Sequence, residues 1–486
     1  MWKVLYSKQV QRWLQNPFGE KNSTKMSTMF GKVETKKLLS ENYSLLSILI
    51  GITLISLSIG PFQNGDTDWE FAAARGVLKW GMPYVNNFGN IINQPPLGFY
   101  IEGLFFKGVG ASVSNGTILV MLLGLGSTIV IYKIGKELYG KPTGLFAAAL
   151  FALSPWELVL SRSFLIDAQC LLFSLLCLYV GILAIRRKSV KLSMISGVLF
   201  AVALLTKYFA AFMLIPLLLF YLYSKPKNAK LFLSQVSSFI LPASLFSLLW
   251  YQAALGKNIF YMFHHSDFIG LNSSGVNLSY SFVGVFLWNY GLGAVFVITS
   301  VFSLLLLVTF KKELPKTFRF DLICLATILI ILVVNMVLGV GLNLQAPYYN
   351  AIKYDYQALP FFCLIAGSLA GKCLSLLTLT KIKTKLSRKI VLPIAAVGIS
   401  LLAATLWVSI SSAHYLSTSG FLLFKVTMNQ VVGYSLFNYA PTSQNSVLMS
   451  LQYVGFLVLL SGLVWFGRHK LHDLFNGLSK PSRSSN

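Results

Sequence analysis

The sequence predicts an all-α polytopic membrane protein with about 12 transmembrane helices. Hydrophobic residues make up 55% of the 486-residue chain, and only 11% of its residues are charged. Apolar runs of roughly 20 residues, enough to cross a bilayer as a helix, recur from one end of the chain to the other. They are continuous and do not alternate with a period of two, which argues against a β-barrel. Because lipid offers no hydrogen-bond partners to a backbone, each run should be helical.

Each predicted span follows from one apolar run between polar segments. The runs are Ser44–Gly60, Thr117–Ile134, Thr143–Leu160, Phe164–Ala184, Leu192–Thr206, Phe209–Tyr223, Leu231–Trp250, Ser281–Phe310, Leu322–Leu342, Ala358–Leu377, Ile390–Ser411 and Val447–Phe466.

The basic residues indicate how these spans are oriented. Most of the 40 Lys and Arg residues fall on the side that carries both ends of the chain, and the positive-inside rule makes this the cytoplasmic side. We therefore expect a basic cytoplasmic tail over residues 1–43, a membrane domain over 44–466 and a second basic tail over 467–486. The net charge of +25 then reflects orientation and contact with lipid surfaces, and no nucleic-acid partner is expected.

The longest predicted outer loop, residues 61–116, holds several of the chain's 15 acids. Its aromatic-rich segments Phe71–Trp80 and Leu97–Val109 are predicted to be short amphipathic helices at the membrane interface. Asp66 and Asp68 lie near its start, together with Glu70. Acids at such a position either cap a helix or sit in a solvated turn, or they form part of a polar site.

A single lysine marks the hairpin Leu192–Tyr223. This stretch is too short for two full spans and a turn, which need roughly 40 residues. Lys207 at its tip should therefore lie beneath the outer surface in a cavity, as intramembrane cations at functional sites do, or it snorkels to the headgroups.

The sequence does not indicate a metal site. The five cysteines lie in apolar segments without ligand spacing and are expected to be buried core residues. His264, His265 and Asp267 fall short of a ligand set, so loop polarity or contact with an acceptor is the alternative. We expect no cofactor, and the sequence neither requires nor excludes a divalent ion.

Several short motifs together resemble one enzyme family. Asp66 precedes Arg75 by nine residues, and the segments Gly81–Tyr84 and Pro95–Leu97 follow. This pattern resembles the first outer loop of the GT-C membrane glycosyltransferases, in particular the protein O-mannosyltransferases and aminoarabinose transferases of glycosyltransferase family 39 and its relatives. Gln94 stands where the family often has Lys or His, and Thr67 where it often has Glu.

The resemblance continues more faintly to about Gly371. Arg162 and Asp167 are similar to an arginine-then-aspartate outer hairpin of the family, and Lys207 with Pro216 to a later hairpin. Lys353 stands where arginine is usual in a late segment. An ion pair between Arg162 and Asp167 is the structural alternative to a role in binding phosphate.

The resemblance implies transfer of a sugar, with inversion, from a polyprenyl monophosphate to an acceptor hydroxyl on a protein, lipid or glycan. A carboxylate must accept the acceptor's proton, and cations must receive the departing phosphate. The base would be Asp66, with Asp68 as substitute. The candidates for binding substrate or lipid phosphate are Arg162, Asp167, Lys207, Lys353, Arg75, Gln94 and His265, with Asp167 orienting Arg162 or the acceptor.

The expected location is the plasma or inner membrane, with the site facing the extracytoplasmic side. A transporter or flippase of a lipid-linked or small polar substrate is the main alternative, although paired halves with matching broken helices are not visible. A polymerase or ligase of surface polysaccharide is a third interpretation.

Overall fold

The computed structural model describes residues 32–59, 65–85, 90–91, 95–224, 228–255, 293–339, 356–379, 388–418 and 446–479. Contacts divide the chain into two units, Met1–Ile48 with Val458–Asn486, and Leu49–Leu457. In the first unit, the rings of Tyr43 and Trp465 lie 5.3 Å apart. The contacts and the candidate site described below belong to the second unit.

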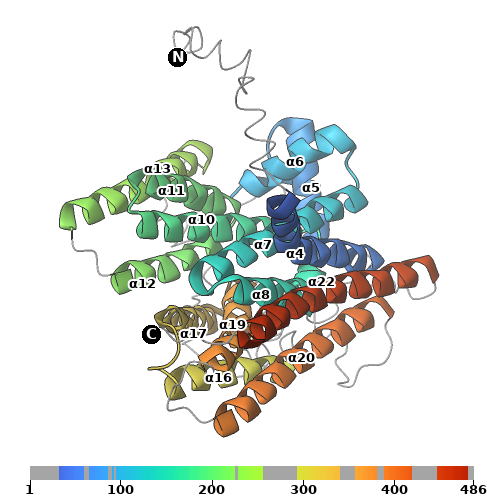
Figure 1. Ribbon diagram of the computed structural model, residues 1–486. Helices are drawn as coiled ribbons and strands as arrows, with labels where there is room; N and C mark the ends of the chain where they lie inside the picture. Colours follow the sequence, from blue (N-terminus) through green and yellow to red (C-terminus); the bar gives the residue numbers. More distant parts are fainter. Residues whose placement is uncertain are drawn as a thin grey trace, which may run out of the picture. The chain divides into compact units, whose positions relative to one another are not determined.

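Helices make up nearly all of the described structure (Figure 1). In chain order they are α4 (Lys32–Ser58), α5 (Gly65–Trp80), α6 (Leu97–Val109), α7 (Val113–Tyr139), α8 (Lys141–Leu153), α9 (Pro155–Leu160), α10 (Asp167–Arg187), α11 (Val190–Thr206), α12 (Leu214–Ser224), α13 (Ala229–Leu255), α16 (Gly293–Thr309), α17 (Phe320–Gly339), α19 (Leu359–Leu379), α20 (Arg388–Thr418) and α22 (Ser446–Ser479). Short 3-10 turns are η2 (Tyr208–Met213), η5 (Lys316–Arg319) and η6 (Tyr356–Ala358). Two short antiparallel strands, β1 (Tyr84–Val85) and β2 (Asn90–Ile91), pair Tyr84 with Ile91.

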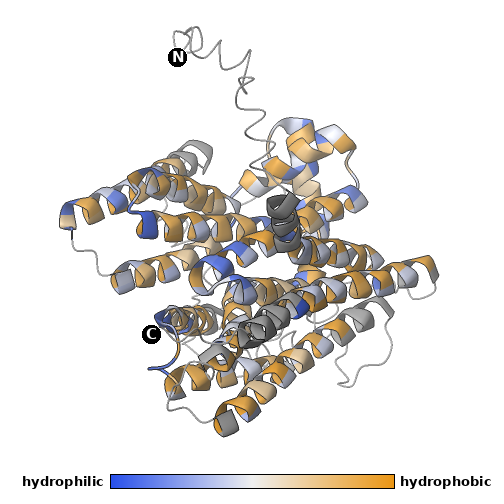
Figure 2. Cartoon of the chain, in the orientation of Figure 1, coloured by the Kyte–Doolittle hydropathy of each residue, from blue (hydrophilic) through white to orange (hydrophobic). Residues whose placement is uncertain are grey.

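The helices are apolar along their lengths, whereas hydrophilic residues gather near their ends (Figure 2). Seven of the described helices are long and apolar enough to cross a membrane, and five shorter apolar helices accompany them. This confirms an all-helical polytopic protein. The count of about 12 spans and the orientation stay predictions.

One predicted span is broken in two. The run Thr143–Leu160 forms α8 up to Leu153 and then α9 from Pro155. A proline disfavours helical geometry in the residue before it and lacks an N–H, so the first helix ends ahead of Pro155. The break leads the chain into a buried connection between α9 and α10.

Small residues allow the central helices to approach closely. A Cβ at Gly135 of α7 would lie 2.8 Å from the Cα of Gly144 in α8. A Cβ at Gly367 of α19 would lie 2.7 Å from the backbone N of Ala147 in α8. Such contacts are typical of membrane helices, which associate by close packing because lipid removes the hydrophobic drive between them. They place α8 between α7 and α19.

The acidic start of the predicted outer loop is helical. α5 begins at Gly65, six residues before the predicted helix at Phe71, so Asp66 and Asp68 lie in its first turn. A negative charge is favourable there because the helix dipole is positive at its N-terminus. The predicted helix Leu97–Val109 is present as α6. The rings of Trp69 and Phe99 join α5 to α6, with centroids 5.7 Å apart.

A buried ion pair joins α16, α17 and α19. Lys372 of α19 donates to the carboxylate of Asp321 of α17, and both side chains are fully buried. The Lys372 ammonium also donates to the backbone oxygen of Ser303 at 2.6 Å. Ser368 donates to the Asp321 carboxylate at 2.9 Å. Buried charges are tolerated only when paired and hydrogen-bonded in this way.

This pair generates a prediction about stability. Lys372→Met alone should destabilise the protein by roughly 3–5 kcal/mol, because it leaves the Asp321 carboxylate buried without its cation. The double variant Lys372→Met/Asp321→Asn should recover much of that loss, because no buried charge remains. Thermal unfolding in detergent measures both. Equal melting temperatures for the single and double variants would contradict the role assigned to the pair.

Candidate active site

The candidate site surrounds the connection between α9 and α10. Residues 161–166 form a short irregular turn, and its side chains are buried. Irregular backbone inside a helical membrane protein is tolerated only where protein covers it or where it lines a cavity. The polar groups of α5, α6, the α11 end and η6 that contact this turn and the first residues of α10 therefore define the site.

Asp167 and Lys207 form an ion pair at this connection. Asp167 is the first residue of α10, and its Oδ2 lies 2.7 Å from the Lys207 Nζ. Lys207 has extended backbone just after the end of α11. Asp167 is 3% exposed and Lys207 is 7% exposed. The burial of Lys207 agrees with the prediction from its short hairpin, and its ammonium lies against a carboxylate.

Glu70 brings α5 to the same turn. Its Oε2 accepts a hydrogen bond of 2.8 Å from the backbone N–H of Ile166, the residue before Asp167. Glu70 is buried, whereas Asp68 is exposed. Residues four apart share one face of a helix, so Asp66 lies on the Glu70 face of α5 and Asp68 on another. The Asp66 side chain lies outside the described residues.

Glu102 brings α6 to the start of α10. Its Oε1 accepts a hydrogen bond of 2.7 Å from the Gln169 Nε2, and Glu102 is 0% exposed. Burial raises the pKa of the Glu102 carboxyl well above its usual value, and the nearby Glu70 charge raises it further. The hydrogen bond from Gln169 lowers this pKa but does not offset the burial. The environment therefore favours the neutral acid.

Arg162 supplies a second cation at the turn. Its Nε donates to the backbone oxygen of Ile59 at 3.1 Å, and the residue is 7% exposed. Its Nη1 is buried and has no hydrogen-bond partner among the described residues. Burial lowers the pKa of the Arg162 guanidinium to about 10, so it stays charged at neutral pH. Among the described residues, this charged donor therefore has no acceptor.

The 3-10 turn η6, which directly precedes α19, completes the site. Tyr356 of η6 donates a hydrogen bond to the Glu157 carboxylate of α9. The next residue, Gln357, donates its Nε2 to the Cys170 Sγ at 3.4 Å. All four residues are buried. Residues distant in the sequence therefore meet at the α9–α10 connection.

Of the predicted site residues, Asp167 and Lys207 form an ion pair, and Arg162 lies buried in the turn that precedes Asp167. Among the described residues, the ion-pair partner of Asp167 is Lys207, whereas the sequence had offered an ion pair with Arg162 as one alternative. Arg75 is exposed, with its guanidinium 5.8 Å from the Phe71 ring centroid. The predictions for Gln94, His265 and Lys353 fall outside the described residues, and so does the Asp66 side chain.

The sequence did not assign a role to several polar residues that the structure places here. Glu70, Glu102 and Gln169 contact the turn or the start of α10, and Tyr356 and Gln357 approach from η6. One signal was available, because Glu102 is the single acid of α6, a largely apolar helix whose one other charged residue is Lys107. The described residues hold no cluster of three or more His, Cys, Asp and Glu side chains that could bind a metal.

Comparison with known proteins agrees with the resemblance. Residues 93–251 match the family described as "Dolichyl-phosphate-mannose-protein mannosyltransferase". A Bacillus subtilis (strain 168) protein described as "Putative mannosyltransferase YkcB" is 27% identical over 160 residues, which cover 33% of this chain and 22% of that protein. The expected resemblance to this family is confirmed. Arg162, Asp167 and Lys207 all lie inside the matched segment, as do Glu102 and Gln169.

The fold also has a solved counterpart. The structure of ArnT from Cupriavidus metallidurans bound to undecaprenyl phosphate matches with a TM-score of 0.51 at 15% identity. The match covers 88% of this chain and 77% of ArnT. At this identity it shows the fold, which is GT-C-like. The matched segment covers only 22% of the length of the Bacillus relative. The activity of that whole protein is therefore not assigned to this chain by the match alone.

The raised pKa of Glu102 predicts a pH-dependent stability. In the unfolded chain this carboxyl loses its proton near its usual value of 4.5, but in the folded protein it does so only at higher pH. Above pH 4.5 the unfolded state therefore binds fewer protons, and the free energy of unfolding falls as pH rises. Glu102→Gln removes this titration and keeps an oxygen that accepts from Gln169.

Thermal unfolding in detergent measures the effect. We expect Glu102→Gln to melt above the parent protein at about pH 8, and this advantage to shrink towards pH 5. A difference in melting temperature that stays constant across this range would show that Glu102 is not buried as a neutral acid.

Proposed function

We propose that this protein is a membrane glycosyltransferase. It transfers a sugar from a polyprenyl monophosphate carrier to an acceptor hydroxyl on the extracytoplasmic side of the membrane, with inversion. The mannosyltransferase match over residues 93–251 and the GT-C-like fold support this. The observation that carries the proposal is the buried site at the α9–α10 connection. There, Arg162 and the Asp167–Lys207 pair lie within the matched segment.

The reaction needs a base beside the acceptor. The acceptor oxygen attacks the anomeric carbon, the bond from that carbon to the phosphate oxygen breaks, and the acceptor's proton moves to a carboxylate. Asp66 is the proposed base, because it shares a face of α5 with Glu70, which contacts Ile166. Asp68 lies on another face and is exposed, which argues against it as the base.

The leaving group needs positive charge. As the bond breaks, negative charge develops on the lipid phosphate, and preorganised donors stabilise it most when they are shielded from water. Arg162 keeps its charge and has a buried N–H without a partner among the described residues. Asp167 holds the Lys207 ammonium in a fixed position. This preorganises the positive charge for a phosphate bound beside it. Four further residues remain candidates for binding the same substrate or its phosphate: Lys353, Arg75, Gln94 and His265.

The activity can be tested directly. Purified protein is incubated with a radiolabelled sugar on a polyprenyl monophosphate and with membrane extract as the source of acceptors. Transfer of label, with release of polyprenyl phosphate, supports the proposal. Uptake of the intact lipid-linked sugar into vesicles without cleavage would instead indicate that the protein is a transporter or flippase.

The choice of base generates a prediction. Asp66→Asn should lower transfer by roughly 10²–10⁴-fold, which is the usual contribution of a positioned base. Asp68→Asn is the matched control on the same helix turn and should retain most activity, because Asp68 is exposed. Both variants should keep the parent's melting temperature. Full activity in the Asp66 variant would reject this assignment.

The phosphate site generates a second prediction. Arg162→Gln should lower kcat/KM for the polyprenyl donor by roughly 10²–10³-fold, because a charged donor to the leaving group is lost. Arg162→Lys keeps the charge but lacks the planar fork, so it should fall between the parent and Arg162→Gln. Melting temperatures of both variants control for the lost bond to Ile59. If the two variants are equally active, the positive charge of Arg162 is not what the reaction uses.

A further inference from the structure

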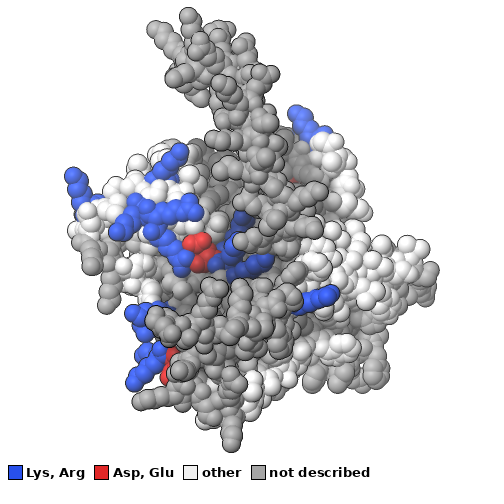
Figure 3. Space-filling model, in the orientation of Figure 1, with Lys and Arg blue, Asp and Glu red and all other residues white. Residues whose placement is uncertain are grey.

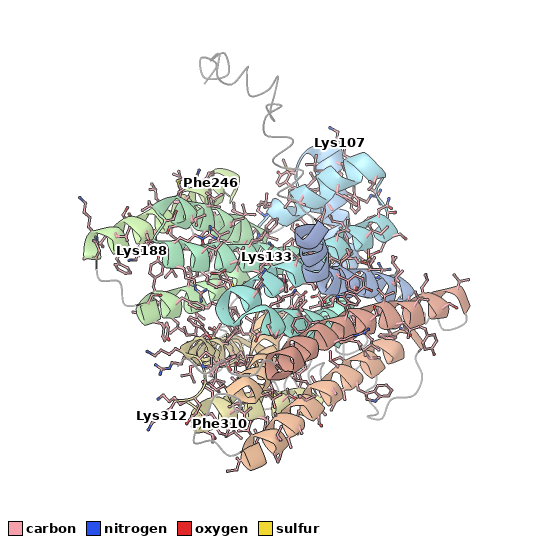
Figure 4. The ribbon with its side chains drawn as sticks, viewed as in Figure 1. Lys107, Lys133, Lys188, Phe246, Phe310 and Lys312 are labelled. Carbon is pink, nitrogen blue, oxygen red and sulfur yellow. The ribbon has the colours of Figure 1, made fainter. Side chains whose placement is uncertain are left out.

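A second concentration of charge lies far from the candidate site, at the other end of α10. Exposed cations at the ends of α7, α10 and α11 form what we call the basic surface, which consists of Lys133, Lys136, Arg186, Arg187, Lys188 and Lys191. Figure 3 shows blue side chains gathered here around a red one. The acid within this stretch of α7 is Glu137. Figure 4 labels Lys133 and Lys188 in this region.

The helix ends that carry the basic surface are fixed against each other. The Arg186 Nη1 donates to the Glu137 Oε1 at 2.9 Å and also to the Glu137 backbone oxygen, which joins the end of α10 to the end of α7. The Arg186 guanidinium lies 5.6 Å from the Phe320 ring centroid at the start of α17. Lys316 and Arg319 of η5 directly precede that phenylalanine. The cations of α7, α10, α11 and η5 therefore belong to one end of the helices.

The length of α10 indicates in which leaflet of a membrane the basic surface lies relative to the candidate site. Asp167 begins this helix at the candidate site, and Arg187 ends it. At 1.5 Å per residue, its 21 residues span about 31 Å, close to the thickness of a bilayer's hydrocarbon core. If one end of α10 reaches the headgroups of one leaflet, its other end reaches those of the opposite leaflet.

We propose that the basic surface binds the phosphate headgroups of anionic phospholipids in the leaflet opposite the candidate site. Clustered Lys and Arg at the ends of membrane helices attract anionic lipid, with roughly a fivefold gain in binding for each cation near the surface. A lipid headgroup fits better than an acidic protein, because α7 and α10 both qualify as membrane spans and end at this surface. This proposal does not depend on the glycosyltransferase activity.

The test uses full-length protein in nanodiscs that contain phosphatidylcholine and a phosphatidylglycerol with a photoactivatable headgroup. After illumination, cross-linked peptides are identified by mass spectrometry. The test variant is Arg187→Gln/Lys188→Asn. Asparagine suits position 188, because the residue there has a φ of 51°, which asparagine tolerates better than most other residues. Arg186 is kept because it pairs with Glu137.

The matched control removes two exposed cations from the other end, Lys79→Gln in α5 and Lys107→Gln in α6. Figure 4 labels Lys107 on α6, away from Lys188. We expect cross-links at the α10–α11 turn to fall roughly fivefold for each cation removed in the test variant, and to stay unchanged in the control. Equal cross-linking in the parent protein and the test variant would overturn the proposal. So would equal labelling by a phosphatidylcholine probe carrying the same reactive group.

Discussion

The buried ion pair between Asp167 and Lys207 is a central constraint on the candidate site. Removing two charges from water costs several kcal/mol for each ion, so they are tolerated only when their geometry is close and fixed. The pair joins the first residue of α10 to the residue that ends α11. It therefore joins these two helices at the site end, where Glu70 of α5 and Glu102 of α6 also contact the start of α10 or the residue before it.

The site lies at helix ends, where irregular backbone leaves polar groups for other partners. The chain is irregular between α9 and α10, and it is extended at Lys207. Backbone polar groups that helices would satisfy are left for other partners here, and the Ile166 N–H finds one in the Glu70 carboxylate. Rigid helices hold these ends in place, which preorganises the charged groups before any substrate arrives. A site of this kind suits the stabilisation of a charge that develops during a reaction.

Two charged regions lie at opposite ends of α10 and differ in their exposure to solvent. At the site end, Asp167 and its neighbours are buried, so each charge is paired or hydrogen-bonded. At the other end, Arg187 and Lys188 are exposed, and solvent tolerates an excess of one sign. One end is therefore suited to chemistry on a bound group, and the other to contact with a charged surface.

The sequence alone determined the helical membrane fold, because a run of apolar residues in lipid has no alternative to a helix. The short hairpin also left two alternatives for Lys207, burial in a cavity or snorkelling to the headgroups, and the structure shows the residue buried. Only the tertiary structure decided that Lys207 is the partner of Asp167, and that Glu70 and Glu102 approach from α5 and α6. Apolar runs indicate which segments cross the membrane, but contacts between residues distant in the sequence depend on how the helices pack. For that reason Arg162 and Lys207 could be proposed as site residues from the sequence, whereas the contacts that hold them could not.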